Sequence, residues 1–134
     1  MSGRRVGSMV LLESGEMYLE TIFRLSMKNA FVRSIDVAEA MGYSKPSVSR
    51  AMGLLRTGGY LIMEPDGKLI LTDKGRAVAE NIYERHKILS AALMNLGVSE
   101  ETAIQDACRV EHYISEETFQ AVKKHALPYV SQKS

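Results

Sequence analysis

Apolar residues recur at helical spacing soon after the start of the chain. A broad stripe that includes Tyr18, Ile22 and Leu25 predicts a helix from about Ser8. Residues 1–8 show no such periodicity and contain two glycines and two arginines. We expect them to form a flexible basic arm.

The next apolar segments predict two helices joined by a tight turn. The first covers residues 35–41, with Ser34 as its N-cap and Gly42 at its end. The second covers residues 45–57 after the N-cap Ser44, and small polar residues stand at its start. A short helix, a glycine turn and a second helix form a helix-turn-helix, whose second helix can enter the major groove of DNA.

Two short apolar runs follow, at residues 60–63 and 68–71. Between them, Asp66 and Gly67 form the dipeptide that favours a tight turn, so a β-hairpin is predicted. The hairpin could simply cap a helical core. Its place directly after a helix-turn-helix favours the wing of a winged-helix domain.

The remaining pattern predicts three more helices, over residues 74–96, from Ser99 onward, and over residues 116–126. Pro128 is expected to end the last helix and to leave residues 127–134 as a tail.

The order of these elements defines the fold class. The chain is predicted to be mainly α, with an N-terminal winged helix-turn-helix of three helices plus a β-hairpin wing over residues 9–73. An α-helical domain over residues 74–126 follows. No internal repeat and no low-complexity linker separates the two.

The composition indicates the class of protein, its cellular location and the kind of partner it binds. Hydrophobic residues are 46% and charged residues 25%, as in a soluble globular protein. No apolar run could span a bilayer and no signal peptide is visible, so we expect a cytoplasmic protein without a membrane partner. One cysteine excludes an intrachain disulfide. Residues 1–60 carry eight Lys/Arg against five Asp/Glu and residues 61–134 carry nine against eleven, which fits a nucleic-acid-binding first half.

The segment around Cys108 carries the strongest chemical signal. On a helix, Cys108, Glu111 and His112 lie at i, i+3 and i+4, so their side chains share one face. A thiol, a carboxylate and an imidazole supply three of the four ligands of a small metal site. The same segment also fits a helix with an ordinary buried cysteine and a solvated Glu–His pair.

An enzyme is not indicated. Serines near His86 and His112 lack the glycine-rich elbow and the oxyanion-hole motif that accompany a nucleophilic serine. We therefore expect no catalysis and no small organic substrate.

Three segments together resemble a known family. They are EMYLETI at residues 16–22, the helix-turn-helix of residues 36–49 with LTDKG at residues 71–75, and DACRVEHYIS at residues 106–115. The chain resembles the metal-dependent repressors that include the diphtheria toxin repressor and the manganese transport regulator. The resemblance extends over roughly residues 9–125.

The resemblance implies a function and an assembly. Such proteins are cytoplasmic homodimers with an N-terminal winged helix and a C-terminal helical domain for dimerisation and metal binding. They bind Fe²⁺ or Mn²⁺ and then a palindromic operator in double-stranded DNA, which represses metal uptake. Some relatives carry an additional small β-barrel domain, and this chain is expected to be a short form without it.

The resemblance also implies a ligand set. Cys108, Glu111 and His112 match the iron-type primary site, and Met17 matches its fourth side chain. Glu20 resembles the manganese-type subgroup, while His86 matches a position used in both. The iron-type ancillary site is incomplete, because Ser90 and Ile104 stand at two of its positions. The implied metal ligands are Met17, Cys108, Glu111, His112, Glu20 and His86.

Ligand softness favours Fe²⁺ as the first choice and Mn²⁺ as the second. Thiolate and thioether ligands suit iron better than manganese, which prefers carboxylates and water. Two alternatives stay open. Cys108 could act as a redox switch in a winged-helix regulator that binds no metal. The cluster could instead hold a purely structural zinc ion.

The candidate DNA contacts lie on the second helix of the helix-turn-helix and around it. Arg50 is the best candidate to read a base, because a guanidinium matches a guanine edge bidentately. Arg33, Arg56 and Lys68 are candidates for phosphate contacts. The expected DNA-binding residues are Ser44, Lys45, Pro46, Ser47, Ser49, Arg50, Arg33, Arg56 and Lys68.

Overall fold

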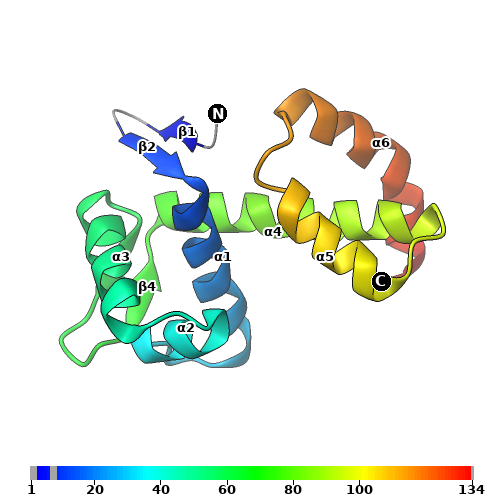
Figure 1. Cartoon of the computed structure of the whole chain (residues 1–134). Helices are drawn as coiled ribbons and strands as arrows, with labels where there is room; N and C mark the ends of the chain where they lie inside the picture. The colour runs from blue at the N-terminus through cyan, green and yellow to red at the C-terminus, as the bar shows by residue number, and fades with distance from the viewer. Residues whose placement is uncertain (1–2, 7–8, 134) are drawn as a thin grey trace. The chain divides into compact units, whose positions relative to one another are not determined.

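The computed structural model describes the backbone of residues 3–6 and 9–133 and the side chains of residues 13–126. The chain divides into two compact units, Gly3–Glu80 and a second one that begins at Asn81 (Figure 1). Helices dominate both units, and the prediction of a mainly α fold with an N-terminal winged helix is confirmed. No helix in the described part of the chain is long and apolar enough to cross a membrane.

The N-terminal unit begins with a hairpin that the sequence analysis did not predict. Strands β1 (Gly3–Val6) and β2 (Met9–Leu12) pair in antiparallel register, with Val6 opposite Met9. The predicted helix start near Ser8 is therefore wrong. Short runs of Val, Leu and Met fit a strand as well as a helix, so periodicity alone does not separate them. Of the predicted arm, residues 1–2 and 7–8 lie outside the described residues.

The helices that follow form the helix-turn-helix. Ser44 caps the third helix, α3 (Lys45–Thr57), since its hydroxyl accepts a hydrogen bond from the Ser47 amide at 3.3 Å. Gly42 ends the second helix, α2 (Ser34–Met41), in the left-handed conformation, with φ 71°. The predicted cap Ser34 is instead the first residue of its helix, and the Arg33 amide donates to the Asp36 carboxylate at 2.9 Å. The helices are α1 (Glu13–Lys28), α2 (Ser34–Met41) and α3 (Lys45–Thr57).

The predicted wing is present as β3 (Leu61–Met63) and β4 (Leu69–Leu71), which pair antiparallel. Its turn needs a glycine, because Gly67 has φ 92°. The Leu69 amide donates to the carbonyl of Val32 at 2.8 Å, which ties the wing to the segment before α2. The apolar side chains of α1, α2, α3 and the wing form the core of this unit.

Helix α4 (Asp73–Asn95) starts in the N-terminal unit and continues into the second. The Thr72 hydroxyl accepts a hydrogen bond from the Gly75 amide at 3.1 Å and so caps the helix. A Cβ atom at Gly75 would lie 1.9 Å from the carbonyl oxygen of Tyr60. Glycine at this position therefore lets the helix start pack against the residue that leads into the wing.

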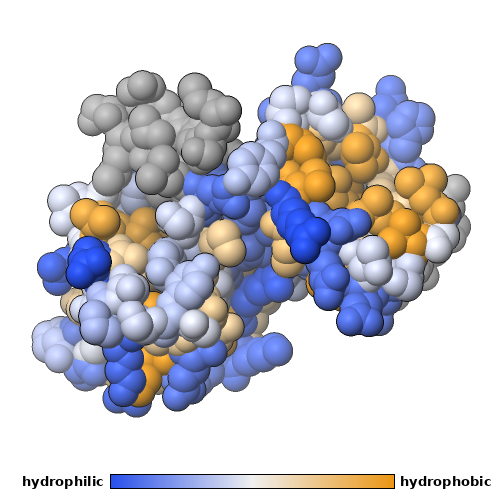
Figure 2. All heavy atoms as spheres, in the orientation of Figure 1, coloured by the Kyte–Doolittle hydropathy of each residue, from blue (hydrophilic) through white to orange (hydrophobic). Residues whose placement is uncertain are grey.

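The C-terminal unit contains the rest of α4 with α5 (Glu100–Val110) and α6 (Glu116–Lys133). Its core joins Ile88 on α4 to Phe119 and Ala126 on α6. Hydrophobic residues also reach the surface of this unit (Figure 2). The predicted end of the last helix is wrong, because α6 continues to Lys133. A proline removes one helical hydrogen bond in its own turn, and the residues after it can remain helical.

Candidate metal centre and DNA-binding face

Three side chains that could bind a metal ion come together in the C-terminal unit. The donor atoms of His86, Cys108 and Glu111 all lie within 4.8 Å of one another. His86 Nδ1 lies 2.9 Å from Glu111 Oε2 and 3.8 Å from Cys108 Sγ. These are the separations at which one ion could contact all three atoms.

Local structure explains why these residues meet. His86 lies within α4, and Cys108 lies in the last turn of α5. The segment was predicted as helix through His112, yet α5 ends at Val110. Glu111 still has helical dihedral angles, φ −58° and ψ −26°, and its amide donates to the Ala107 carbonyl at 2.9 Å. The i, i+3 relation of Cys108 and Glu111 is therefore kept beyond the end of the helix.

His112 follows in the turn and also contacts Glu111. Its Nε2 lies 3.4 Å from Glu111 Oε1, and only 2% of its side chain is exposed. The two carboxylate oxygens of Glu111 thus each face an imidazole, His86 on one side and His112 on the other. This arrangement concentrates nitrogen and oxygen donors around one buried carboxylate.

The chemistry of this set fits a divalent transition metal. The Glu111 side chain is 1% exposed, and a carboxylate at such depth is costly unless a cation or strong donors balance it. Imidazole, thiolate and carboxylate together suit Fe²⁺, Co²⁺ and Zn²⁺. Cys108 is exposed, which gives an ion a route to the cluster.

The other predicted ligands lie on α1 in the N-terminal unit. Met17 is half-buried and Glu20 is buried. Glu20 forms an ion pair with Arg24 one turn later, with 2.7 Å between Arg24 Nη2 and Glu20 Oε2. A metal that used this carboxylate would have to compete with a guanidinium.

The two positions expected to leave the ancillary site incomplete can also be placed. The Ser90 hydroxyl donates to the His86 carbonyl at 2.8 Å, so it serves the helix backbone. Ile104 is exposed on α5 and offers no donor atom.

Sequence reasoning missed Arg85, which is 2% exposed. Its Nη1 donates to the carbonyls of Glu111 at 3.1 Å and Ile114 at 3.0 Å, and its Nη2 donates to the Glu116 carboxylate at 2.8 Å. The available signal was position, because Arg85 follows Ile82 by three residues and precedes Leu89 by four, on the apolar stripe of α4. An arginine on such a stripe needs buried acceptors.

The predicted DNA contacts of α3 are exposed in the N-terminal unit. Ser44 and Ser47 also serve the helix start, because the Ser44 hydroxyl donates to the Ser47 hydroxyl at 2.9 Å. Val48 and Met52, on the opposite side of α3, are buried. The exposed candidates on and before this helix are Ser44, Lys45, Pro46, Ser47, Ser49, Arg50 and Arg56.

Two more basic candidates, Arg33 and Lys68, lie beside the wing or within it. The Arg33 side chain lies against the wing turn, with its Cδ 3.5 Å from where a Cβ at Gly67 would be. Its guanidinium carbon lies 5.6 Å from the centre of the Phe31 ring. Lys68 follows the turn and is half-buried. Arg33 thus lies beside the wing turn, and Lys68 follows that turn in the sequence.

The fold and the cluster together define a winged-helix DNA-binding protein with a donor set suited to a metal. Family models agree with both parts. Residues 10–69 match the N-terminal DNA-binding domain of iron-dependent repressors, and residues 72–126 match their metal-binding and dimerisation domain. The chain belongs to the iron-dependent repressor family, as its resemblance to these proteins suggested.

Individual relatives support this assignment. The transcriptional regulator MntR of Escherichia coli O6:H1 is 38% identical over 106 residues, which cover 79% of this chain and 68% of that protein. MntR of Geobacillus kaustophilus is 35% identical over 102 residues, covering 76% and 72%. These relatives are transcriptional regulators and not enzymes, so the expectation of no catalysis is confirmed.

Solved structures share the fold. A structure described as the manganese regulator SloR superposes with a TM-score of 0.74 at 28% identity, covering 86% of this chain and 54% of that one. The metal-dependent transcriptional regulator MtsR gives a TM-score of 0.78 at 27% identity, with the same coverage. This chain therefore spans about half the length of these two proteins.

Proposed function

We propose that the protein is a metal-activated transcriptional repressor that controls metal-ion homeostasis. Fe²⁺ is its preferred activator and Mn²⁺ the second. The observation that carries this proposal is the cluster of His86, Cys108 and Glu111 in one unit, combined with a winged helix in the other. The functional boundaries that we propose are residues 9–73 for DNA binding and residues 74–126 for metal binding and dimerisation.

Two features favour Fe²⁺ over Mn²⁺. Cys108 supplies a thiolate, which is a poor ligand for manganese. Glu20, the ligand that would suit manganese, is paired with Arg24. Against this, SloR is described as a manganese regulator, so the choice of metal needs a direct measurement.

The proposed mechanism works by restricting motion. His112 is a further ligand beside Cys108 and Glu111, and Met17 is the fourth side chain that the family resemblance implies. With metal bound, a homodimer can place its two α3 helices in successive major grooves, about 34 Å apart. Metal binding thus removes conformations that cannot engage both half-sites of a palindromic operator.

An apolar groove offers a surface for the proposed homodimer. It has a volume of about 430 Å³ and lies between the end of α4 and α6. Leu96, one of its lining residues, is 80% exposed. Its lining residues are Ala92, Asn95, Leu96, Ala121, Val122, His125 and Ala126.

The test is a metal titration of DNA binding under anaerobic conditions. An operator is first selected from a random duplex library with metal-loaded protein. Chelator-stripped protein is then titrated with Fe²⁺ or Mn²⁺, and binding of the labelled operator is followed by fluorescence anisotropy at fixed salt. We expect Fe²⁺ to switch binding on at a lower concentration than Mn²⁺.

Other outcomes would change the proposal in defined ways. Equal or better activation by Mn²⁺ would overturn the iron preference. Operator binding that does not change on addition of either metal would overturn metal activation. Unfolding on chelation would indicate a structural zinc ion. Control by peroxide alone would indicate a redox switch at Cys108.

The matched control is the Gln105→Ala variant. Gln105 is exposed on α5 but contributes no donor atom to the cluster. It should keep the metal response of the unmodified protein. A loss of that response in Cys108→Ser, the variant that removes the thiol in the same titration, can then be attributed to the thiol.

A further inference from the structure

One buried guanidinium joins the helix that carries His86 to the turn that carries Glu111 and His112. Arg85 immediately precedes His86 on α4. Its Nη1 donates to the backbone carbonyls of both Glu111 and Ile114. Through this one side chain, the turn that carries Glu111 and His112 is held in place relative to His86.

We propose that Arg85 is a positioning residue of the metal site, a role that rests on the proposed function. It holds the 111–114 turn in place before metal binds, so that the Glu111 carboxylate lies between the imidazoles of His86 and His112. Arg85 does not contact the metal. It acts through the backbone of a ligand, and its effect is to lower the cost of assembling the site.

The end of α5 creates the need for such a residue. The last carbonyls of a helix have no partner within the helix. At this end they lie next to the ligand Glu111, because α5 stops at Val110. Arg85 donates to the carbonyl of Glu111, the first residue after α5, and its positive charge is favourable beside a helix C-terminus. The Val110 carbonyl already accepts from the amides of Tyr113 and Ile114, so Arg85 supports the turn after the helix, where the ligands are located.

Helix α6 fixes the orientation of the guanidinium. Glu116 pairs with Arg85 Nη2 at 2.8 Å, and the guanidinium carbon lies 5.2 Å from the centre of the Phe119 ring. The carboxylate balances the buried charge, and the ring packs against the planar group. Arg85 therefore has a single arrangement in which all its acceptors are reached.

Lysine cannot reproduce this arrangement. The guanidinium is a rigid planar fork with several donors, whereas an ammonium group is a single compact charge. In Arg85→Lys, the charge is kept, but the donors all start from one nitrogen in place of the two that reach the carbonyls and Glu116. This variant separates the effect of geometry from the effect of charge.

The test measures cobalt binding and backbone protection separately from DNA binding. Co²⁺ is titrated anaerobically into stripped protein, and the thiolate-to-cobalt absorption band reports occupancy of the site. Hydrogen exchange of the amides at residues 111–115 is measured in the metal-free protein. The variants are Arg85→Lys, Arg85→Met and Glu116→Gln.

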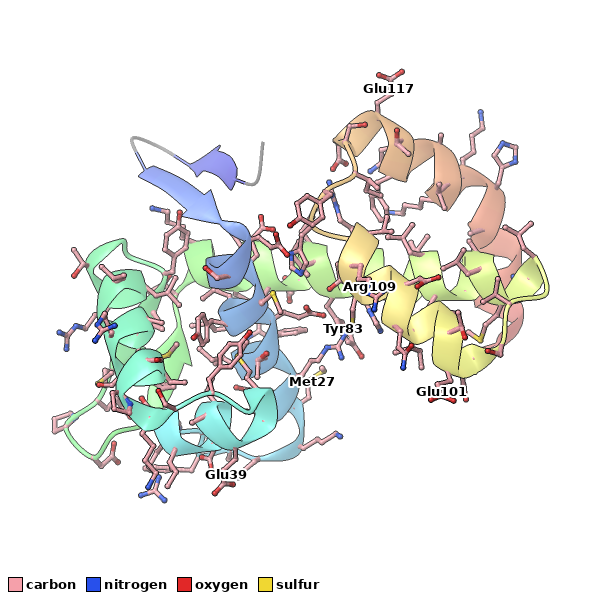
Figure 3. All side chains as sticks on the ribbon, viewed as in Figure 1. Met27, Glu39, Tyr83, Glu101, Arg109 and Glu117 are labelled. Carbon is pink, nitrogen blue, oxygen red and sulfur yellow. The ribbon has the colours of Figure 1, made fainter. Side chains whose placement is uncertain are left out.

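We expect Arg85→Lys to weaken Co²⁺ binding about 10–100-fold, the range typical of residues that support metal ligands. Exchange at residues 111–115 should accelerate in the same variant. Glu116→Gln should give smaller changes in the same direction, because the carbonyl contacts remain. Arg109→Met should change neither measurement, since Arg109 is an exposed residue of α5 (Figure 3) that follows Cys108 in the sequence.

The outcomes separate the two proposals. If the unmodified protein shows no cobalt–thiolate band, the proposed function fails first. If it shows the band and Arg85→Lys binds Co²⁺ equally well with unchanged exchange, the role of Arg85 is overturned. A lower melting temperature with unchanged Co²⁺ affinity would make Arg85 a structural residue only. Should Arg85→Met not fold, Arg85→Lys still decides between these results.

Discussion

The side chains that we expect to contact DNA are exposed along α3, whereas those that we expect to bind metal are mostly buried between α4 and the turn after α5. Lys45 and Arg50 are both exposed residues of α3. Glu111 is enclosed and lies within contact distance of two imidazoles. Exposed residues should act nearly independently, while buried and mutually contacting residues should act as a unit.

The largest effect is expected in the metal cluster. His86→Ala and Cys108→Ala should each weaken metal-dependent DNA binding by more than about 100-fold, because loss of a ligand costs more than loss of its supporting residue. The double variant should be little worse than either single one. Isothermal titration with Fe²⁺ and operator binding measure this. Strictly additive losses would contradict a single shared site.

Arg50 tests whether the exposed face reads sequence. Arg50→Ala should cost about 1–3 kcal/mol of operator binding and relax discrimination at one base pair. Competition between single-base operator variants measures both quantities. Arg76→Ala is the control, because Arg76 is also exposed but lies on α4 and pairs with Glu80. Uniform weakening on all operators would move Arg50 to the phosphate contacts.

Substitutions at Ser44 separate its role as the N-cap of α3 from its proposed role as a DNA contact. Ser44→Ala should lower the free energy of unfolding by about 1 kcal/mol, because the cap of α3 is lost. Ser44→Asn should keep the cap and the stability. Thermal melts give the first quantity, and operator binding by Ser44→Asn gives the second. Unchanged melting of Ser44→Ala would contradict the capping role.

The smallest effects are expected at the wing. Lys68→Ala and Arg33→Ala should each reduce the salt dependence of DNA binding by about 0.9 in the logarithmic slope, which is the loss of one phosphate contact. The weakening should be the same for all sequences. Anisotropy titrations at several salt concentrations measure the slope. A slope unchanged by both substitutions would remove the wing from the DNA-binding face.

The N-terminal unit shows what local sequence signals determine. Ser44, Gly42 and Gly67 predicted a cap, a helix end and a turn, and each is where it was expected. These features depend on one residue and its nearest neighbours. The hairpin of β1 and β2 was missed because it depends on pairing between two segments. Gly3–Val6 shows no periodicity of its own, and Met9–Leu12 is compatible with a helix.

The candidate metal site shows which features local sequence signals do not predict. The spacing of Cys108 and Glu111 predicted their shared face, but the place of His86 came from resemblance to known repressors. Arg85 and the pairing of Glu20 with Arg24 were not predicted. Both depend on which oxygen atoms the folded chain brings near a guanidinium, and a sequence pattern does not contain that information.

The most direct test of the central claim is anomalous diffraction at the iron edge from crystals grown anaerobically with Fe²⁺. The account predicts an iron peak bonded to Cys108 Sγ and a Glu111 carboxylate oxygen, with an imidazole nitrogen also in contact. An iron peak away from these atoms, in protein whose DNA binding still depends on iron, would contradict it.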